Sequence, residues 1–270
     1  MNITKSNSNR KGIILAGGSG TRLYPATQAI SKQLLPVYDK PLIFYPISTL
    51  MLAGIRQILI IVAPTQLSLF QTALGNGSAW GIEIEYIVQD EPRGIAHGLI
   101  LADEFVGKDS FALILGDNVF YGSGLGRTLS KFSNVAGAHI FVQNVNNPER
   151  FGVLEVSGTA EIISLEEKPI KPKSSLAITG LYFFDFRAIE IAKTLKPGRR
   201  GELEILDVLN HFFRIGQLSY TKMDLGTAWL DTGTFQSLHD AGTFVRLIEE
   251  RQGLSFGNPL EISRNFGWVQ

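Results

Sequence analysis

The sequence predicts an α/β fold in which a mostly parallel central sheet is flanked by helices. Short aliphatic runs, GIILA (12–16), QILIIVA (57–63) and FALIL (111–115), are typical of buried strands. Segments with a helical spacing of apolar residues separate these runs, as expected of right-handed βαβ units. The middle of the chain has several strand patterns with little helix between them, which predicts antiparallel strands added at one edge of the sheet.

The elements of the first half follow from these patterns in chain order. The strand at 12–16 is stopped by glycines, and the helix predicted at 44–54 ends at Gly54, which suits a C-cap. The run at 82–89 alternates apolar and polar residues, which favours an outer strand. Further helices are predicted at 65–74 and 94–105.

The second half begins with the predicted antiparallel strands and ends in helices. The strands are expected at 138–145, 151–157, 161–168 and 177–185. The helices are expected at 186–195, at 202–216 and, as one long helix, at 234–253. The sequence contains no tandem repeat, linker or low-complexity tract, so we expect one compact α/β domain.

Composition excludes several classes of function. The chain has 270 residues, with 25 Lys and Arg against 25 Asp and Glu, and this balance gives no electrostatic footprint for nucleic acid or an anionic membrane. The absence of cysteine excludes disulfides and thiolate catalysis, and it fits a reducing cytoplasm. The N-terminus lacks an apolar secretory segment, and the longest aliphatic run, ILIIVA, is much shorter than a membrane span of about 20 residues. We therefore expect a soluble cytoplasmic protein.

The first strand leads into a glycine-rich loop, Gly17-Gly18-Ser19-Gly20-Thr21-Arg22, that fits neither common phosphate-binding motif. It lacks the lysine of a P-loop, and Leu23 replaces the third glycine of a dinucleotide fingerprint, which disfavours a nicotinamide oxidoreductase. The glycines still let a phosphate approach converging backbone N–H groups, and Arg22 and Lys32 add positive charge. The loop therefore predicts a phosphate site, with a tight turn and a solvated arginine as the alternative.

Two aspartates predict a metal site beside this loop. Asp117 follows the buried strand FALIL, and Asp231 follows the apolar pair Trp229-Leu230. Magnesium is usually held by one or two carboxylates together with substrate phosphates. The alternative is that Gly-Asp-Asn and Asp-Thr-Gly are ordinary turn sequences.

Other stretches carry polar groups suited to a substrate. In EEKP, strand alternation places Glu166 and Lys168 on one face and Glu167 on the other. The pair Arg199-Arg200 precedes a predicted helix, where an anion is favoured, and the amide of Gln89 suits the edge of a base. A solvated surface is the alternative for each. None of the four histidines shows metal-ligand spacing in the sequence.

In this order the stretches resemble those of the sugar nucleotidyltransferases. The motif GGxGTRLxPxT (17–27) is followed by KxLLPVxxKP (32–41), and later come LILGDN, SLEEKP, TGLYFFD, RGELEILDV and WLDTGT. The fuller stretches are similar to the thymidylyl-transferring branch. The resemblance implies a Rossmann-like nucleotidyltransferase fold with an added β-rich sugar-binding layer. It implies a single domain over 1–270, with a catalytic core at 11–235 and a C-terminal helical segment at 236–270, in a cytoplasmic homotetramer.

The same resemblance implies Mg²⁺-dependent transfer of a thymidylyl group from dTTP to glucose 1-phosphate, with release of pyrophosphate. It assigns catalysis to Arg22, Lys32, Asp117 and Lys168, and magnesium binding to Asp117 and Asp231. It assigns nucleotide binding to Leu15, Gly17, Gly18, Gly20, Thr21, Gln89 and Gly94. It assigns sugar-phosphate binding to Gly152, Glu167, Lys168, Tyr182 and Arg200. The cations and magnesium would offset repulsion between two phosphate-bearing substrates.

The chain departs from the family pattern near Gln89. Where a stretch like QPSPDGLAQA is expected, it has QDEPRGIAHG (89–98), with Arg93 and His97. A uridylyl-, cytidylyl- or adenylyltransferase acting on another sugar 1-phosphate is therefore the alternative activity. A catalytically silent nucleotide-binding subunit is a further alternative, but the presence of Arg22, Lys32 and both aspartates favours an active enzyme.

Overall fold

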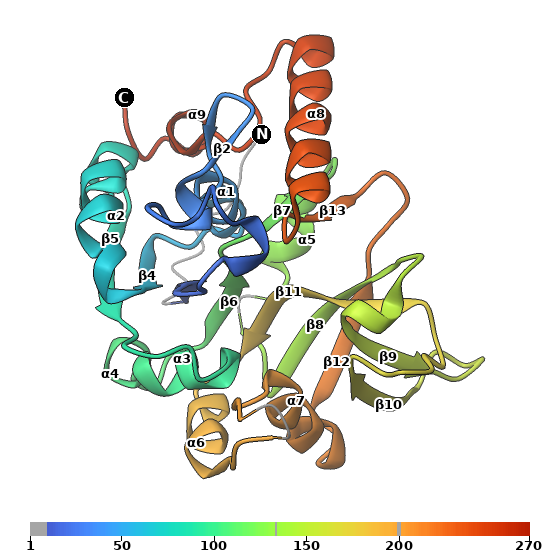
Figure 1. Ribbon diagram of the computed structural model, residues 1–270. Coiled ribbons are helices and arrows are strands. Elements are labelled where there is room, and N and C mark those ends of the chain that lie inside the picture. Colours follow the sequence, from blue (N-terminus) through green and yellow to red (C-terminus); the bar gives the residue numbers. More distant parts are fainter. Residues whose placement is uncertain (1–9, 133, 199–200) are drawn as a thin grey trace.

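The large sheet is the central feature of the computed structural model, which describes residues 10–132, 134–198 and 201–270 (Figure 1). Within these residues, nine strands form one sheet in the order β10-β9-β11-β6-β1-β4-β5, with β8 paired to β11 and β12 paired to β8. The strands are β1 (Lys11–Ala16), β4 (Gln57–Val62), β5 (Glu83–Val88), β6 (Phe111–Leu115), β8 (Ala138–Asn144), β9 (Gly152–Val156), β10 (Ile162–Glu167), β11 (Leu176–Phe184) and β12 (Leu218–Lys222).

The strands from the first half of the chain form the predicted parallel part of this sheet. β1 pairs in parallel with β4 and β6, and β4 pairs in parallel with β5, which is the outer strand. The strands read as continuous aliphatic runs because helices cover both faces. Ile13 and Ile14 are both fully buried, yet they belong to hydrophobic clusters on opposite faces of the sheet. Each such side chain contributes roughly 1.5–3 kcal/mol by leaving water.

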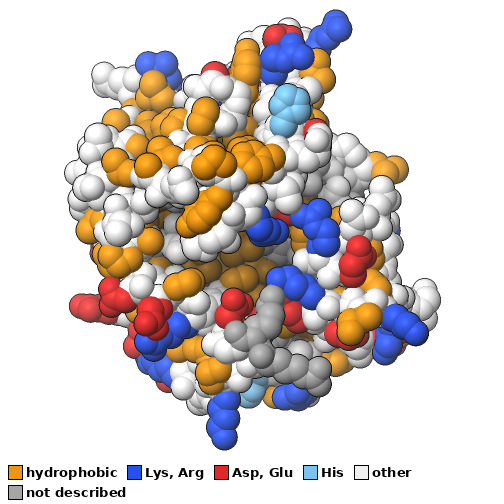
Figure 2. All heavy atoms as spheres, in the orientation of Figure 1, with side chains coloured by type: hydrophobic (Ala, Val, Ile, Leu, Met, Phe, Trp, Pro, Cys, Tyr) orange, Lys and Arg blue, Asp and Glu red, His pale blue; other side chains and the backbone are white. Residues whose placement is uncertain are grey.

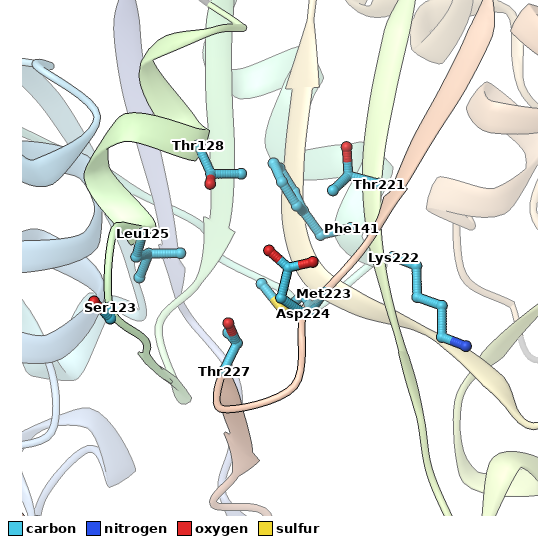
Figure 3. Close-up of a pocket in the computed structure, with 9 residues that line it drawn as sticks. All are labelled: Ser123, Leu125, Thr128, Phe141, Thr221, Lys222, Met223, Asp224 and Thr227. Atoms are coloured by element: carbon cyan, nitrogen blue, oxygen red, sulfur yellow. The ribbon is translucent and has the colours of Figure 1, made fainter.

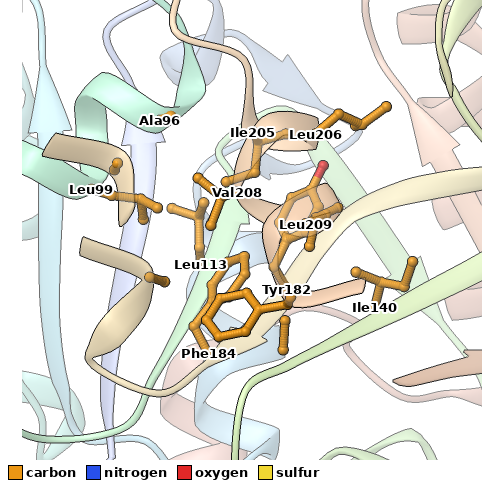
Figure 4. Packing of buried hydrophobic residues seen from close by; sticks show 14 of the residues in the cluster. Ala96, Leu99, Leu113, Ile140, Tyr182, Phe184, Ile205, Leu206, Val208 and Leu209 are labelled. Carbon is orange, nitrogen blue, oxygen red and sulfur yellow. The ribbon is translucent and has the colours of Figure 1, made fainter. Parts of the chain in front are cut away.

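Two sets of helices cover these faces. One face packs against α1 (Phe44–Leu52), α2 (Leu67–Leu74) and α5 (Leu125–Ser130). The other packs against α3 (Ile95–Leu101), α4 (Asp103–Val106), α6 (Arg187–Thr194) and α7 (Ile205–Arg214). Figure 4 shows the second cluster, in which Leu113 of β6 and Phe184 of β11 meet Leu209 of α7.

The other half of the sheet is antiparallel, and it carries the added strands that the sequence predicted. β11 runs antiparallel to β6, β8 and β9, and β9 forms a hairpin with β10. β12 pairs in parallel with β8. All nine residues of β11 are buried because strands flank it on both sides and helices pack on the sheet. The predicted α/β class, with a mixed sheet and helical layers, is confirmed.

Two small ribbons lie outside the large sheet. β7 (Asn118–Tyr121) pairs with β13 (Ala228–Asp231), and β2 (Pro36–Val37) pairs with β3 (Lys40–Pro41). Helix α8 (Phe235–Gln252) packs on both ribbons through a third cluster that includes Val37, Val119 and Ala241. The last helix, α9 (Pro259–Phe266), packs against α1.

Local differences from the sequence prediction have identifiable causes. The helix expected at 94–105 is divided at Ala102, whose ψ of 2° is not helical, into α3 and α4. α1 ends at Leu52, and Gly54, with φ of +80°, lies just beyond its C-cap. Four features were not predicted because their sequences lack a clear periodic pattern. They are the ribbon β7–β13, strand β12 and helices α5 and α9. Nowhere in the described stretches is a helix both long and apolar enough to span a bilayer.

Candidate active site

The glycine-rich loop lies at the carboxyl end of β1, between the ends of β4 and β6. Gly20 has φ of +62°, and its carbonyl accepts hydrogen bonds from Thr27 Oγ1 at 2.7 Å and from the N–H of Leu23 at 2.9 Å. A Cβ on Gly17 would lie 2.8 Å from Oε1 of Gln89, whereas a Cβ on Gly18 would meet nothing within 4 Å. The loop is therefore supported from within the protein and leaves open backbone at Gly18.

Lys32 and Asp117 form the innermost ion pair of the site. Lys32 begins a short 3-10 helix, η2 (Lys32–Leu34), and Asp117 lies between β6 and β7. Lys32 Nζ donates to Asp117 Oδ2 across 2.6 Å, and the lysine side chain is only 6% exposed. Asp117 Oδ1 accepts a second hydrogen bond from Asn118 Nδ2 at 2.8 Å. Two segments 85 residues apart thus meet at the end of the parallel strands.

Pairing of β13 with β7 brings the second aspartate to this point. Asp231 lies opposite Asn118 in the ribbon, and Thr232 Oγ1 donates to the Asp117 carbonyl at 2.8 Å. Oδ2 of Asp231 accepts from Arg150 Nη2 at 3.1 Å. Burial and the nearby charge of Asp117 raise the pKa of Asp231, while Lys32, Arg150 and Arg22 act in the opposite direction.

Arg22 completes the charged cluster. A Cβ placed on Gly233 would lie 3.1 Å from both terminal nitrogens of Arg22 and 3.0 Å from Oδ1 of Asp231. The guanidinium and the Asp231 carboxylate therefore lie close together beside Gly233. Figure 2 shows a hollow on this face of the molecule, with Lys and Arg side chains along its rim. The charged residues that converge here are Arg22, Lys32, Asp117, Arg150 and Asp231.

The donor set suits a magnesium ion that is completed by its substrate. Asp117 and Asp231 are close enough for the charge of one to raise the pKa of the other, and a divalent cation would relieve this repulsion. No cluster of three or more possible His, Asp or Glu ligands occurs among the described residues, so these two carboxylates would act without a third. Magnesium commonly takes one or two carboxylates and fills its octahedron with phosphate oxygens and water.

The sugar-side residues predicted from the family resemblance also lie together. Glu167, the last residue of β10, pairs with Gly152 at the start of β9. A Cβ on Gly152 would lie 3.4 Å from Glu167 Oε2, and Glu167 Oε1 is 3.7 Å from Lys168 Nζ. Tyr182 on β11 is buried, and both its burial and the charge of Glu167 raise its pKa. Figure 4 shows its hydroxyl end directed toward Leu206, at the start of α7.

The strand-alternation prediction for Glu166 and Lys168 is wrong. Lys168 has φ of +44°, so the chain leaves the extended conformation directly after Glu167. As a result Lys168 turns toward Glu167, while Glu166 is exposed. Alternation holds only while successive residues remain in a pleated strand.

The remaining predicted residues of the described chain lie in β1, in η1 and between β5 and α3. Gln89 directly follows β5 and is 8% exposed. Gly94 has φ of +99°, and a Cβ there would collide with Leu203, so its backbone conformation and its packing both account for the glycine. Leu15 packs against Gly98 of α3, and Thr21 is exposed in η1 (Thr21–Leu23). Arg200, together with Arg199, lies outside the described residues.

Sequence reasoning missed Arg150 and the partner of Gln89. Arg150 ends a short 3-10 helix, η5 (Pro148–Arg150), and no local pattern distinguishes it from a solvated arginine. His97 was noted as a departure from the family pattern, but its hydrogen bond to Gln89, with 2.9 Å between Nδ1 and Nε2, depends on α3 packing beside β5. Both contacts arise from tertiary structure.

A separate small pocket contains none of the predicted site residues (Figure 3). It has a volume of about 30 Å³ and lies among Thr128, Phe141, Thr221 and Thr227. A space of this size holds a water molecule rather than a nucleotide. The hollow in Figure 2 is therefore the better candidate for the active site.

Fold and site together define a protein that handles nucleoside phosphates, and comparison with known proteins specifies the class. The model of the nucleotidyl transferase family matches residues 11–247, and the chain belongs to that family. The mixed sheet flanked by helices is accordingly the nucleotidyltransferase fold expected from the sequence.

Individual relatives are more specific. A glucose-1-phosphate thymidylyltransferase of Neisseria meningitidis serogroup A is 53% identical over 260 residues, covering 96% of this chain and 90% of the relative. One from Mycolicibacterium smegmatis is 52% identical, with the same shares covered. A solved structure of a provisionally assigned glucose-1-phosphate thymidylyltransferase from Bacillus anthracis, in complex with sucrose, has a TM-score of 0.83 and 40% identity, and covers 93% of this chain and 99% of that one.

Proposed function

We propose that this protein transfers a thymidylyl group from dTTP to glucose 1-phosphate, giving dTDP-glucose and pyrophosphate. The observation that carries the proposal is the convergence of Arg22, Lys32, Asp117 and Asp231 beside the glycine loop. The relatives that carry the name of this activity are more than half identical to the chain over nearly its whole length, which supports the choice of substrates.

The chemistry asks little of a general base, because a sugar phosphate is already a nucleophile. The main obstacle is repulsion between its phosphate and the triphosphate. Arg22 in the loop and Lys32 beside Asp117 would place positive charge on the triphosphate, and Lys168 would do so on the sugar phosphate. Such fixed charges hold the two phosphates in line and stabilise the transition state at the α-phosphorus.

The cofactor that we propose is Mg²⁺, held by Asp117 and Asp231. When bound, the ion would neutralise phosphate charge as the bond to the leaving pyrophosphate lengthens. Lys32 and Arg150 now occupy oxygens of these two carboxylates. Their proposed role is to keep the paired carboxylates ionised and pre-positioned before the substrates arrive.

Substrate contacts are proposed on both sides of the charged cluster. Gly17, Gly18, Gly20, Thr21 and Leu15 would hold the nucleotide, with Gln89 and Gly94 at the base. Gly152, Glu167, Lys168 and Tyr182 would surround the sugar phosphate, together with Arg200. The carboxylate of Glu167 is suited to sugar hydroxyls, since its oxygens can accept their hydrogen bonds and it lies beside Gly152 and Lys168.

Assembly and location complete the proposal. We place the chemistry in residues 11–235 and give the helical segment 236–270 a supporting role within one domain, in a cytoplasmic homotetramer. Size-exclusion chromatography with light scattering tests the tetramer, whose expected mass is four times the 29.7 kDa of the chain. A monomeric mass would remove that part of the proposal.

The decisive experiment is a substrate panel read by pyrophosphate release. The purified protein is incubated with glucose 1-phosphate and each of dTTP, UTP, dCTP and ATP, with and without Mg²⁺. We expect the highest kcat/KM with dTTP and no turnover in EDTA. A clear preference for another nucleotide would replace the thymidylyl assignment, and binding without turnover would favour a silent regulatory subunit.

A further inference from the structure

Gln89 is held in one position between the glycine loop and α3. Its backbone N–H donates to the Val62 carbonyl at 2.8 Å, and its side chain extends between the glycine loop and α3. The Oε1 end lies toward the loop, since a Cβ on Gly17 would be 2.8 Å from it. The Nε2 end lies 2.9 Å from His97 Nδ1. The two ends of the carboxamide therefore have different neighbours.

Helix α3 fixes the imidazole of His97 against this amide. The helix lies so close to β1 that a Cβ on Gly98 would collide with the Leu15 side chain. Its first turn is tied to the chain before α7, because the N–H of Ala96 donates to the Leu203 carbonyl at 3.1 Å. His97 projects from this anchored turn, so the distance between its ring and Gln89 is set by the fold.

The protonation of His97 decides which end of the amide faces it. With the proton on Nε2, Nδ1 is an acceptor, and it takes the hydrogen bond from Gln89 Nε2. Partial burial and the positive charge of Arg93 lower the pKa of His97, which favours this neutral form at pH 7. An imidazolium would donate from Nδ1, and the carboxamide would have to reverse to accept.

Charged groups on the neighbouring segments surround the imidazole of His97. Arg93 acts directly on the imidazole, and it is itself paired with Glu91, at 3.0 Å between Nη2 and Oε2. The helices packed against α3 are α4, α6 and α7, and with the N-cap of α7 they carry the ionisable residues Asp103, Glu104, Arg187, Glu190, Lys193, Glu204, Asp207, His211 and Arg214. Arg93 is the group among these that adds to the effect of burial on His97.

We propose that His97 is a positioning residue for base selection, acting through Gln89; this rests on the proposed function, in which Gln89 meets the base. When the imidazole is neutral, the Gln89 amide has its acceptor, Oε1, toward the glycine loop and its donor, Nε2, toward α3. This order suits a pyrimidine with a proton on N3 and an oxygen at C4, as in thymine and uracil. Cytosine presents the opposite order, because its N3 accepts and its 4-amino group donates.

Binding measurements on the full-length protein test this role without requiring turnover. Calorimetry gives the dissociation constants of dTTP and dCTP at pH 7.5 and 5.5, for wild type and the variants His97→Leu, His97→Gln and Gln89→Ala. Because both nucleotides carry the same triphosphate, its titration cancels in the ratio of the two constants. Loss of one oriented hydrogen bond corresponds to about a tenfold change in that ratio.

The expected pattern separates orientation from simple packing. Wild type prefers dTTP at pH 7.5 and loses several-fold of that preference at pH 5.5. His97→Leu and Gln89→Ala reduce the preference about tenfold at pH 7.5. His97→Gln, whose amide oxygen can still accept, keeps the preference and no longer responds to pH. In turnover assays His97→Leu raises KM for dTTP while kcat stays within about twofold.

Unchanged selectivity in His97→Leu would overturn the proposal. So would a wild-type protein whose ratio of dTTP and dCTP dissociation constants is the same at both pH values. Unchanged selectivity in Gln89→Ala would overturn it as well, because the base would then lie elsewhere. Failure of the proposed function looks different: dTTP would bind with the predicted His97 dependence, yet no pyrophosphate would be released. The two ideas can therefore fail separately.

Discussion

The parallel and antiparallel halves of the large sheet place their polar side chains by different means. In the parallel half, Gln89, Asp117 and the glycine loop each follow the end of a parallel strand, so the strand ends alone bring them together. In the antiparallel half, Lys168 depends on a left-handed backbone conformation, and beside this half Asp231 depends on the separate ribbon formed by β7 and β13. Arg150 reaches the same point from η5.

This difference separates side chains positioned by the local sequence from side chains positioned by long-range contacts. A hydrophobic run fixes where a parallel strand ends, and parallel strands end at the same edge of the sheet. The ribbon pairs residues more than 100 positions apart, with Asn118 opposite Asp231. We therefore expect substitutions in the parallel half to affect chemistry with little change in structure, and substitutions in the antiparallel half to affect binding or stability as well.

The largest effect is expected for Lys32→Ala. Removal of the charge next to Asp117 and the proposed triphosphate site should lower kcat by about 10²–10³, as for loss of one preorganised donor. Asp117 keeps its hydrogen bond from Asn118 and is 24% exposed, so the fold should survive. Pyrophosphate release and circular dichroism measure the two outcomes.

Lys40→Ala is the matched control for that variant. Lys40 is also almost buried and paired with a carboxylate, Glu249, at 2.9 Å, but it lies in β3 outside the charged cluster. We expect Lys40→Ala to lower the melting temperature and to leave kcat near the wild-type value. Equal losses of kcat in both variants would mean that any buried lysine matters equally, and the special role of the strand-end cluster would be lost.

Asp231→Asn should uncouple activity from stability. Burial and Asp117 raise the pKa of Asp231, so in the folded protein the ionised form is disfavoured relative to the unfolded chain. A raised carboxyl pKa means that stability is lost as pH rises through it, and at pH 7 the ionised group opposes folding. The neutral variant should therefore melt about 2 °C higher.

The same variant should lose about 100-fold in turnover, because it has lost one of the two proposed ligands for Mg²⁺. Mg²⁺ with dTTP should raise the melting temperature of wild type but not that of Asp231→Asn. A lower melting temperature without metal would mean that attraction to Lys32 and Arg150 outweighs repulsion from Asp117. Melting curves with and without Mg²⁺ distinguish these cases.

The comparison also explains how much the sequence could predict. The buried strands and the glycine loop follow from local composition, so the α/β class and the clustering of Arg22, Lys32 and Asp117 were accessible. The sequence suggested Asp231 as a site residue because it follows an apolar stretch, but it did not predict the ribbon that positions this residue. Arg150 and the orientation of His97 have no local pattern at all. The face on which Lys168 lies was mispredicted from alternation because its left-handed backbone conformation ends the strand geometry.

Glu167→Gln tests the sugar side of the site. The carboxylate lies beside Gly152 and Lys168, and its proposed partners are sugar hydroxyls. We expect KM for glucose 1-phosphate to rise about tenfold, with KM for dTTP unchanged, because one charge-assisted hydrogen bond is weakened. Steady-state kinetics with each substrate varied in turn gives both constants.

Glu166→Gln provides a neighbouring control with the same chemistry. Glu166 is exposed on the other side of the strand end, so its KM values should match those of wild type. If Glu166→Gln produced the larger rise in KM for glucose 1-phosphate, the sugar would lie on the face that alternation predicted. The antiparallel half would then bind its ligand on the opposite side from the charged cluster.

Acid is expected to act on the stability of the antiparallel half rather than on turnover. His139 of β8 is 3% exposed, stacks on Phe132, and has Ser219 Oγ at 2.7 Å and Thr221 Oγ1 at 3.0 Å from its ring nitrogens. Burial lowers its pKa to about 4. A histidine whose pKa is lowered in the folded protein contributes its full stabilisation of the fold above its unfolded pKa of about 6.5. This stabilisation is lost as pH falls toward the folded pKa.

At pH 5 the loss should be on the order of 2 kcal/mol, or several degrees in melting temperature. His139→Gln should flatten this dependence, whereas His239→Gln, at an exposed position on α8, should not. Hydrogen exchange between pH 7 and 5, corrected for intrinsic exchange rates, locates the loss of stability. Strands β8 and β12 should lose protection before β1 and β4, because the central residues of β1 and β4 are aliphatic and do not titrate. Equal loss in all four strands would mean that the sheet opens as one unit, and the two halves would then differ in how they position side chains but not in how they unfold.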